Sequence, residues 1–119
     1  ALEFRINAED PSNNFMPSPG KLESLAISGG PGVRVDFGFE DGSTVAPFYD
    51  SLLGKVIVWA PTRELAIARA KRVLDESRIE GVKTSMGMLR KLVGLEDFAS
   101  VSHHTKYIES IPGLLEDLA

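Results

Sequence analysis

Apolar and polar residues alternate strictly at the start of the chain, over residues 2–7. This period of two is typical of a β-strand that buries one face. The apolar set is Leu2, Phe4 and Ile6, and the polar set is Glu3, Arg5 and Asn7. The strand should end between Asn7 and Pro11, because Asn, Asp and Pro favour turns. We therefore expect a rigid strand whose outer face presents a carboxylate, a guanidinium and an amide in a row.

Further strands are predicted through the first half of the chain. The prolines of residues 11–21 predict a stiff extended connector, which Phe15 and Met16 should hold to the core. A second strand is expected at residues 22–27. Residues 33–39 alternate and predict a strand with one buried face. The Asp41-Gly42 pair predicts a hairpin that returns through residues 43–46. The continuous β-branched and aromatic run of residues 56–60 indicates a strand buried on both faces.

The second half of the chain changes to the helical period. A helix should begin at the capping residue Thr62 and end at Gly81, with an apolar stripe made of Ala66, Ile67, Ala70, Val73 and Leu74. A second helix is predicted from Ser85 to Gly94 with Met88, Leu89, Leu92 and Val93 facing inward. A short turn or helix is expected at residues 96–99, and a last helix from Thr105, broken at Pro112-Gly113. Strands followed by helices predict an α+β fold, in which helices pack on a small, mainly antiparallel sheet.

Composition narrows the function classes. The 119 residues suit one domain, with a net charge of −4 that does not favour nucleic acid or anionic membranes. No apolar run approaches the ~20 residues of a membrane-spanning helix. There are no cysteines, which excludes disulfides and thiol chemistry and suits a cytoplasmic protein. Because the chain opens directly on a strand, we expect it to be part of a longer protein.

Arg5 is the strongest candidate for chemistry. A guanidinium fixed on a strand suits bidentate binding of a carboxylate, bicarbonate or phosphate. The alternative is a structural ion pair with Glu3, Glu9 or Asp50. Glu3 and Glu9 could also be simple solvated carboxylates rather than an acid and base pair.

Three other features are weaker candidates for chemistry. Asp50 precedes a predicted buried strand, where it could hold Arg5 or cap a turn. Gly54-Lys55 lacks the glycine spacing of a phosphate-binding loop. His103-His104 has no third ligand at helical spacing, so we predict no metal site there.

The chain resembles the C-terminal domain of the biotin carboxylase family, which serves acyl-CoA, pyruvate and urea carboxylases. The opening run FRINAEDP at residues 4–11 is highly specific to that family. The likeness continues over nearly the whole chain, at residues 15–21, 32–36, 49–55, 63–69, 79–84 and 105–109.

This resemblance implies a ligase activity that residue chemistry alone could not show. Family members use ATP and Mg²⁺ to activate bicarbonate and then carboxylate biotin on a carrier protein. A preceding ATP-grasp domain, absent from this chain, mainly holds the nucleotide and metal. The domain represented here supplies the wall of the active site on the biotin and bicarbonate side. An isolated fragment of this kind is expected to be inactive.

The resemblance also assigns roles to individual residues. Arg5 matches the family arginine that stabilises the biotin enolate and binds bicarbonate, a use of preorganised charge. Glu9, Asp10 and Asp50 match supporting positions. Further roles fall to Arg34, at the contact of a homodimer, and to Thr105 and Lys106, at the edge of the ATP pocket. The competing hypothesis is a non-catalytic scaffold or interaction module. In that case Arg5 could be changed freely, and surface apolar residues such as Leu114, Leu115 and Leu118 would matter instead.

Overall fold

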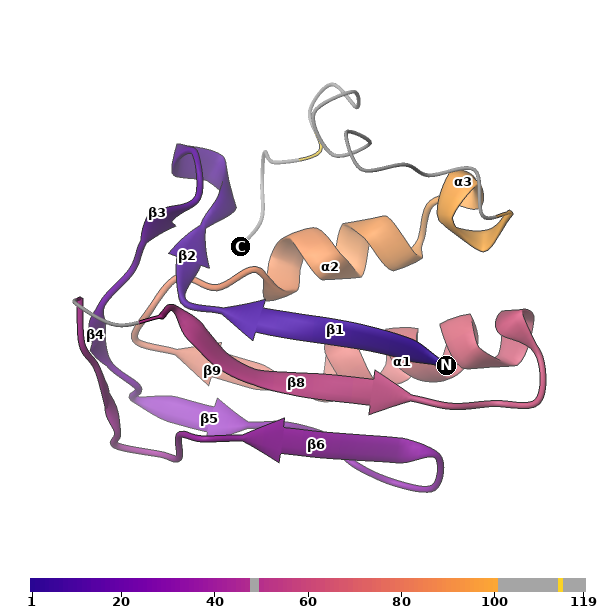
Figure 1. Ribbon diagram of the computed structural model, residues 1–119, viewed down its shortest axis with the longest axis horizontal. Coiled ribbons are helices and arrows are strands. Elements are labelled where there is room, and N and C mark those ends of the chain that lie inside the picture. The colour runs from indigo at the N-terminus through magenta and orange to yellow at the C-terminus, as the bar shows by residue number, and fades with distance from the viewer. Residues whose placement is uncertain (48–49, 101–113, 115–119) are drawn as a thin grey trace.

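Strand β1 (Leu2–Asn7) forms where the alternation predicts it and is one edge of a three-stranded sheet. The sheet has the order β1-β8-β6, with β8 (Leu52–Val58) in the centre and β6 (Val33–Phe37) at the other edge (Figure 1). Both pairings are antiparallel, as the sequence predicts. The computed structural model describes residues 1–47, 50–100 and 114.

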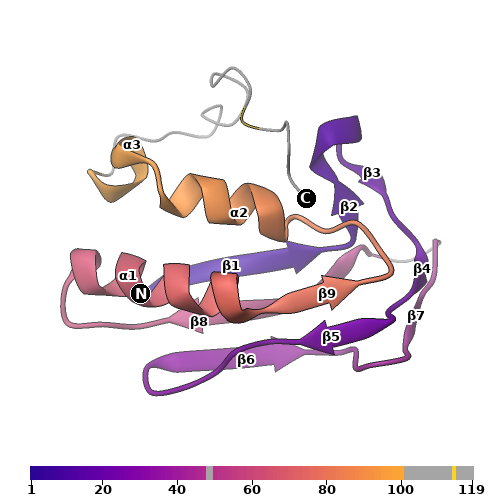
Figure 2. The ribbon, with the colours of Figure 1, turned by 180° about the vertical axis from the view of Figure 1, so that it is seen from behind.

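Helix α1 (Arg63–Glu76) covers one face of this sheet, and α2 (Met86–Val93) lies beside the β1 edge (Figure 2). The short α3 (Glu96–Ala99) follows α2, as predicted. Between helices and sheet lies the core, whose largest fully buried side chains are Ile6, Leu22, Leu53, Leu74, Val56, Val58, Val73 and Val93. The α+β prediction is therefore confirmed, and the opposite face of the sheet is left open for polar side chains.

Three very short strand pairings and one 3₁₀ turn join the remaining described chain to this core. Strand β2 (Glu9–Asp10) pairs with β3 (Met16–Pro17), and β4 (Gly20–Lys21) pairs with β7 (Thr44–Val45). Strand β5 (Ser24–Ala26) pairs with β9 (Arg78–Glu80), and a single 3₁₀ turn, η1 (Pro11–Asn13), connects β2 to β3. All three pairings are antiparallel, and those of β4 with β7 and of β5 with β9 join distant parts of the chain, so a local pattern could not reveal them.

Several strand predictions in the first half are wrong in detail. Residues 11–21 are not a plain connector, and Met16 is 54% exposed rather than packed in the core. The return strand after Asp41-Gly42 pairs with β4 and not with its predicted hairpin partner. Val35 on β6 is 37% exposed, because this edge strand extends beyond the cover of α1.

Strand β8 is also buried on one face only. Val56 and Val58 are buried, whereas Lys55 and Ile57 lie half-buried on the outer face. Trp59, predicted to be inside, is 58% exposed just after the strand ends. The continuous apolar run of residues 56–60 is therefore the end of an alternating strand followed by an exposed tryptophan, and the prediction of a strand buried on both faces is wrong.

The first helix begins as predicted, with the Leu65 amide donating to the Thr62 hydroxyl at 3.2 Å. All five residues of its predicted apolar stripe are buried. It ends at Glu76 rather than Gly81, because the next residues form β9. Gly81 has φ of +105°, and a Cβ there would collide with the carbonyl oxygen of Lys21, so this glycine permits a tight turn and not a helix end.

The second helix agrees with prediction at Met88 and Val93, which are buried, while Leu89 and Leu92 are half-buried. Leu114 is buried, which contradicts its predicted surface role in a scaffold. The predicted last helix, His103-His104, Thr105, Lys106, Leu115 and Leu118 lie outside the described residues.

Candidate functional site

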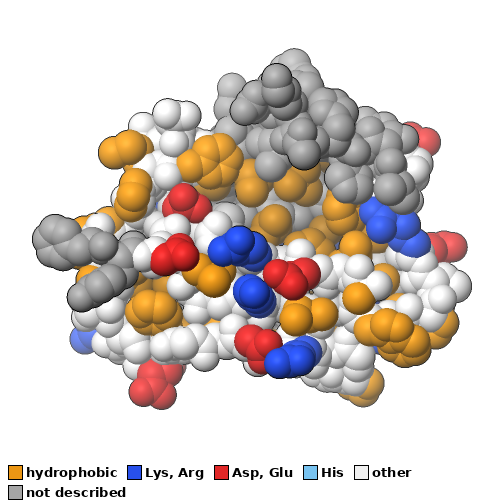
Figure 3. Space-filling view, viewed as in Figure 1, with side chains coloured by type: hydrophobic (Ala, Val, Ile, Leu, Met, Phe, Trp, Pro, Cys, Tyr) orange, Lys and Arg blue, Asp and Glu red, His pale blue; other side chains and the backbone are white. Residues whose placement is uncertain are grey.

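The open face of the three-stranded sheet gathers the charged side chains that the alternation directs away from the core. Figure 3 shows basic and acidic side chains together over the middle of this face. Strand register places five of them there, namely Glu3, Arg5, Lys55, Arg34 and Asp36. The face is rigid, because Phe4 and Ile6 anchor β1 from the buried side.

Arg5 lies directly opposite Lys55 in the register of β1 and β8. Side chains that are directly opposite in an antiparallel pair have Cβ atoms about 4.5–5.5 Å apart. Arg5 is exposed, and no salt bridge within residues 1–47, 50–100 and 114 includes its guanidinium. The predicted structural ion pair with Glu3, Glu9 or Asp50 is therefore not formed in that part of the chain.

The other charges of the face do have partners. Glu3 lies 3.9 Å from the Lys55 ammonium, and the Arg34 Nε lies 3.0 Å from an Asp36 carboxylate oxygen. Like charges directly opposite on a sheet are unfavourable. Arg5 and Lys55 thus form a pair of cations in which the guanidinium is left with its hydrogen-bonding fork available. Such a pair is suited to binding a small oxyanion.

None of the three predicted supporting carboxylates forms a salt bridge with Arg5 in the described part of the chain. Glu9 is half-buried in β2 opposite Pro17. Asp10 caps η1, accepting from the Ser12 amide at 3.0 Å and from its hydroxyl at 2.6 Å. Asp50 accepts from the Leu52 amide at 3.0 Å and so caps the start of β8, the second of its two predicted alternatives. Their contribution to a site remains a prediction.

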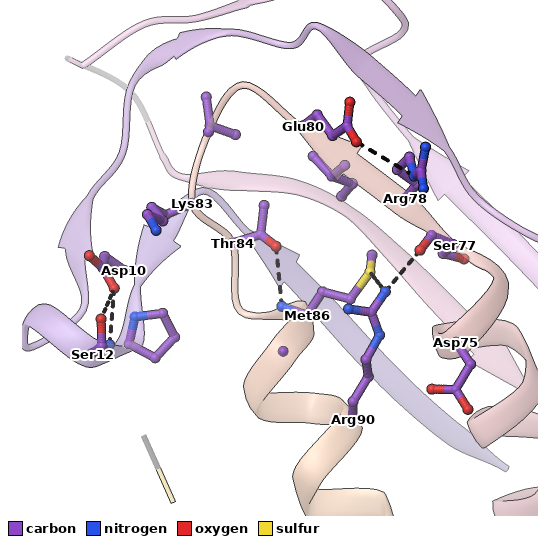
Figure 4. Close-up of a pocket in the computed structure, with 14 residues that line it drawn as sticks. Asp10, Ser12, Asp75, Ser77, Arg78, Glu80, Lys83, Thr84, Met86 and Arg90 are labelled. Atoms are coloured by element: carbon purple, nitrogen blue, oxygen red, sulfur yellow. Dashed lines mark hydrogen bonds and ion pairs between the residues drawn. The ribbon is translucent and has the colours of Figure 1, made fainter. Parts of the chain in front are cut away.

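A separate cavity of about 890 Å³ lies between η1, β9 and the start of α2 (Figure 4). Its rim has both signs of charge, from Asp10, Asp75, Glu80, Arg78, Lys83 and Arg90. Arg78 pairs with Glu80 at 3.6 Å. Arg90 donates to the carbonyls of Leu74 and Ser77, at 2.9 and 2.8 Å, and so caps the end of α1. Arg78 and Arg90 are therefore both held by contacts within the fold, unlike the Arg5 guanidinium.

Within residues 1–47, 50–100 and 114, no group of three or more His, Asp or Glu side chains could hold a metal ion. Within the same residues, no helix has the length and apolar content to cross a bilayer.

Lys55 is the site residue that sequence reasoning missed. Its position on the outer face follows from the alternation of Lys55 and Ile57 with the buried Val56 and Val58, and it lies just before the run of residues 56–60 that was predicted to be buried on both faces. Its pairing with Arg5 joins residues fifty positions apart, and only the sheet register reveals it.

Comparison with known proteins agrees with this geometry. Residues 3–110 match the family model of the biotin carboxylase C-terminal domain. The chain is 48% identical over 110 residues to biotin carboxylase 1 of Bacillus subtilis, an alignment that covers 92% of this chain and 24% of that protein.

Solved structures give the same result. The biotin carboxylase domain dimer of Hydrogenobacter thermophilus 2-oxoglutarate carboxylase, in complex with MgADP, ADP and bicarbonate, superposes with a TM-score of 0.92 at 40% identity, over 96% of this chain and 25% of that one. A complete multifunctional pyruvate carboxylase of Rhizobium etli superposes with a TM-score of 0.91 at 36% identity, over 97% of this chain and 11% of that one.

The chain thus spans about a quarter or less of the length of these relatives. Sequence, fold and family model agree over almost all of its residues. The chain belongs to the biotin carboxylase C-terminal domain family.

Proposed function

We propose that this domain works as part of a biotin carboxylase, an ATP-dependent carbon–nitrogen ligase that carboxylates carrier-bound biotin with bicarbonate. The observation that supports it most is Arg5, an exposed arginine fixed on β1, opposite Lys55 and without an ion pair in the described part of the chain. The Hydrogenobacter structure binds bicarbonate, which is a substrate of this reaction, and MgADP, which contains the product of ATP cleavage.

The donor set of the sheet face suits the bicarbonate and biotin side of such a site. Bicarbonate has the planar oxygens that a guanidinium fork binds through two parallel hydrogen bonds. Carrier-bound biotin supplies the nitrogen that accepts the carboxyl group. Arg5 holds a fixed positive charge beside the oxygen on which negative charge develops, and a charge already in place needs no reorganisation during the reaction.

The same face does not fit Mg²⁺. Its two central side chains, Arg5 and Lys55, are cations, and the described residues offer no cluster of three metal-binding side chains. We propose that ATP and Mg²⁺ are bound mainly by an ATP-grasp domain elsewhere in the protein, and that Thr105 and Lys106 contribute to the edge of that pocket. The four-fold greater length of the relatives is consistent with such a domain.

Partners follow from the same proposal. The ATP-grasp domain would complete the site, and a biotin carboxyl carrier domain would bring its biotin to it. The whole assembly is proposed to be cytoplasmic. Arg34, exposed on edge strand β6, is proposed to lie at a homodimer contact, as suggested by the dimer seen in the Hydrogenobacter relative. An Arg34→Glu protein should then sediment as a smaller species than the parent.

The decisive experiment compares Arg5→Ala with the parent in the full-length protein that contains this domain. The rate of bicarbonate- and biotin-dependent ATP cleavage should fall in Arg5→Ala, because the activation barrier should rise by about 2 to 4 kcal/mol. Arg78→Ala is the matched control, because it changes an exposed arginine on a different strand, β9. This variant should retain parental activity. A parental rate for Arg5→Ala would favour the scaffold hypothesis. The isolated chain should show no biotin-dependent ATP cleavage.

A further inference from the structure

Ser85, just before α2, makes three hydrogen bonds to the segment of β1 that contains Arg5. Its hydroxyl donates to the carbonyl oxygen of Arg5 at 3.1 Å and accepts from the amide of Asn7 at 3.1 Å. Its own amide donates to the carbonyl oxygen of Asn7 at 3.0 Å. The three bonds cross between parts of the chain that are about eighty residues apart, and they enclose Ile6, which is fully buried.

The Ser85 hydroxyl makes these bonds instead of its usual local one. A serine at the N-cap of a helix normally accepts a hydrogen bond from an amide of the first turn. Ser85 occupies that position in α2, yet its side chain makes no cap bond, and the Met86 amide turns to the Thr84 hydroxyl at 3.3 Å. Departures from a local rule of this kind concentrate at functional sites.

Ser85 contacts β1 at a point where the strand has few other backbone hydrogen-bond partners. β1 is an edge strand, so one side of its backbone has no partner strand in the described sheet. On its other side the register with β8 shifts between Ile6 and Asn7, which weakens the ladder next to Arg5. Ser85 is only 4% exposed, so its bonds are protected from water.

From these contacts we propose that Ser85 is a positioning residue, which fixes the backbone of β1 and thereby aims the Arg5 guanidinium. This inference rests on the function proposed for Arg5. Groups that act on a reacting atom must be held by a supporting shell to within a fraction of an ångström. A displacement of about 1 Å can lower a rate by about 100-fold, so a loosened strand should lower kcat measurably.

The test is a double-mutant cycle in the full-length protein, with kcat for bicarbonate- and biotin-dependent ATP cleavage as the readout. Ser85→Ala should lower kcat by about 10-fold, within the range expected for a misplaced catalytic group, and leave the KM for ATP unchanged. In an Arg5→Lys background the same change should have almost no further effect, because it acts through the Arg5 side chain. A purely structural role would lower activity equally in both backgrounds.

Two further variants keep the result interpretable. Ser77→Ala removes another serine that is 4% exposed, whose hydroxyl donates to the Val73 carbonyl at 2.6 Å and accepts from the Ser28 amide at 3.0 Å. It should cost similar stability and leave kcat at the parental value. Ser85→Cys is nearly isosteric and a weak donor, so it should fold even if Ser85→Ala does not, and should lower kcat in the same Arg5-dependent way.

The outcomes separate the two claims. Full activity of Ser85→Ala or Ser85→Cys, additive losses in the cycle, or an equal loss in Ser77→Ala would overturn the positioning role and leave the role of Arg5 intact. Parental activity of both Arg5→Lys and Arg5→Ala would overturn the proposed function, and the positioning role with it.

Discussion

Arg5 and Lys55 stand directly opposite each other on β1 and β8, although two like charges in that relationship oppose sheet formation. The Glu3 carboxylate, 3.9 Å from Lys55, and Asp36, which is opposite Lys55 in the register of β6 and β8, offset part of this repulsion. An arrangement that works against folding is explained if an anion completes it. Substitutions at Lys55 should therefore change anion binding while the fold changes little.

Lys55→Glu should weaken the use of bicarbonate by the full-length protein. The substitution places a carboxylate opposite Arg5, where it would neutralise the charge of the guanidinium. The new carboxylate would also lie near Glu3, and the two would repel each other. Exposed pairs contribute about 0.2–1 kcal/mol, so the free energy of unfolding should change by less than about 1 kcal/mol, while the KM for bicarbonate rises. Steady-state kinetics over a range of bicarbonate concentrations measures this. Lys55→Gln should give an intermediate KM, and an unchanged KM in both variants would contradict an anion site at this pair.

Gly54→Ala should destabilise the domain by about 1 to 3 kcal/mol, the usual cost of overpacking. A Cβ on Gly54 would overlap the ring of Phe37 and come within 2.6 Å of the Asp36 carbonyl oxygen, so β8 and β6 could not keep their spacing. Gly38→Ala is the control, because nothing lies within 4 Å of its added Cβ, and it should change stability by less than about 0.5 kcal/mol. Urea unfolding of the two variants tests this, and equal stabilities would show that the sheet adjusts freely.

Sequence reasoning predicted well those elements in which a short repeat of apolar residues continues over many neighbouring positions. Strand β1 and the buried stripe of α1 follow from alternation over six residues and from a helical repeat over fourteen. Each of these patterns is set by neighbours a few positions apart. The same reasoning identified Arg5, because its direction on a one-sided strand follows from parity alone.

What sequence reasoning missed depends on long-range pairing. Strands β4 and β7 have two residues each, too few for a period, and β9 interrupts what was predicted to be helix. Lys55 and Ser85 reach the neighbourhood of Arg5 only through the sheet register and the contact between α2 and the edge of β1. Residue types near those positions give no sign of that contact.

Arg63→Met should loosen α3 while leaving α1 folded. The Arg63 guanidinium donates to the carbonyl oxygens of Phe98 and Ala99, at 2.6 and 3.2 Å, and its carbon lies 4.9 Å from the centre of the Phe98 ring. Losing a charged hydrogen bond and a cation–π contact should cost about 1 to 3 kcal/mol locally.

Hydrogen exchange of the backbone amides in residues 96–99 measures this loss. Faster exchange is expected there, with little change in residues 66–74. The control, Lys21→Met, alters an exposed cation on β4, at the other end of the molecule from α3 (Figure 1), and should leave exchange in α3 unchanged. Equal protection in Arg63→Met and the parent would mean that α3 is held by other contacts.

Glu76 should make stability depend on pH in the acid range. The Ser28 hydroxyl, which donates to the Glu76 carboxylate at 2.7 Å, is the largest cause of its lowered pKa, and Arg72 at 2.9 Å adds a charge effect. A lowered pKa means that the folded state binds this proton more weakly than the unfolded chain does. The contact therefore stabilises the fold above the ordinary pKa of 4.5, and the stabilisation is lost as the pH falls through the lower pKa of the folded state.

Glu76→Gln should therefore be less stable than the parent in urea at about pH 7, and the two should converge as the pH falls below the lowered pKa of the folded state, where both states of the parent are largely protonated. Salt should also reduce the difference at neutral pH, because the carboxylate is exposed. Asp75→Asn provides the control: it removes the neighbouring exposed carboxylate on α1, and its difference from the parent should not follow this pH profile. A stability gap for Glu76→Gln that stays constant from neutral to acid pH would show that the link from the end of α1 to the turn at Ser28 does not depend on the charge of Glu76.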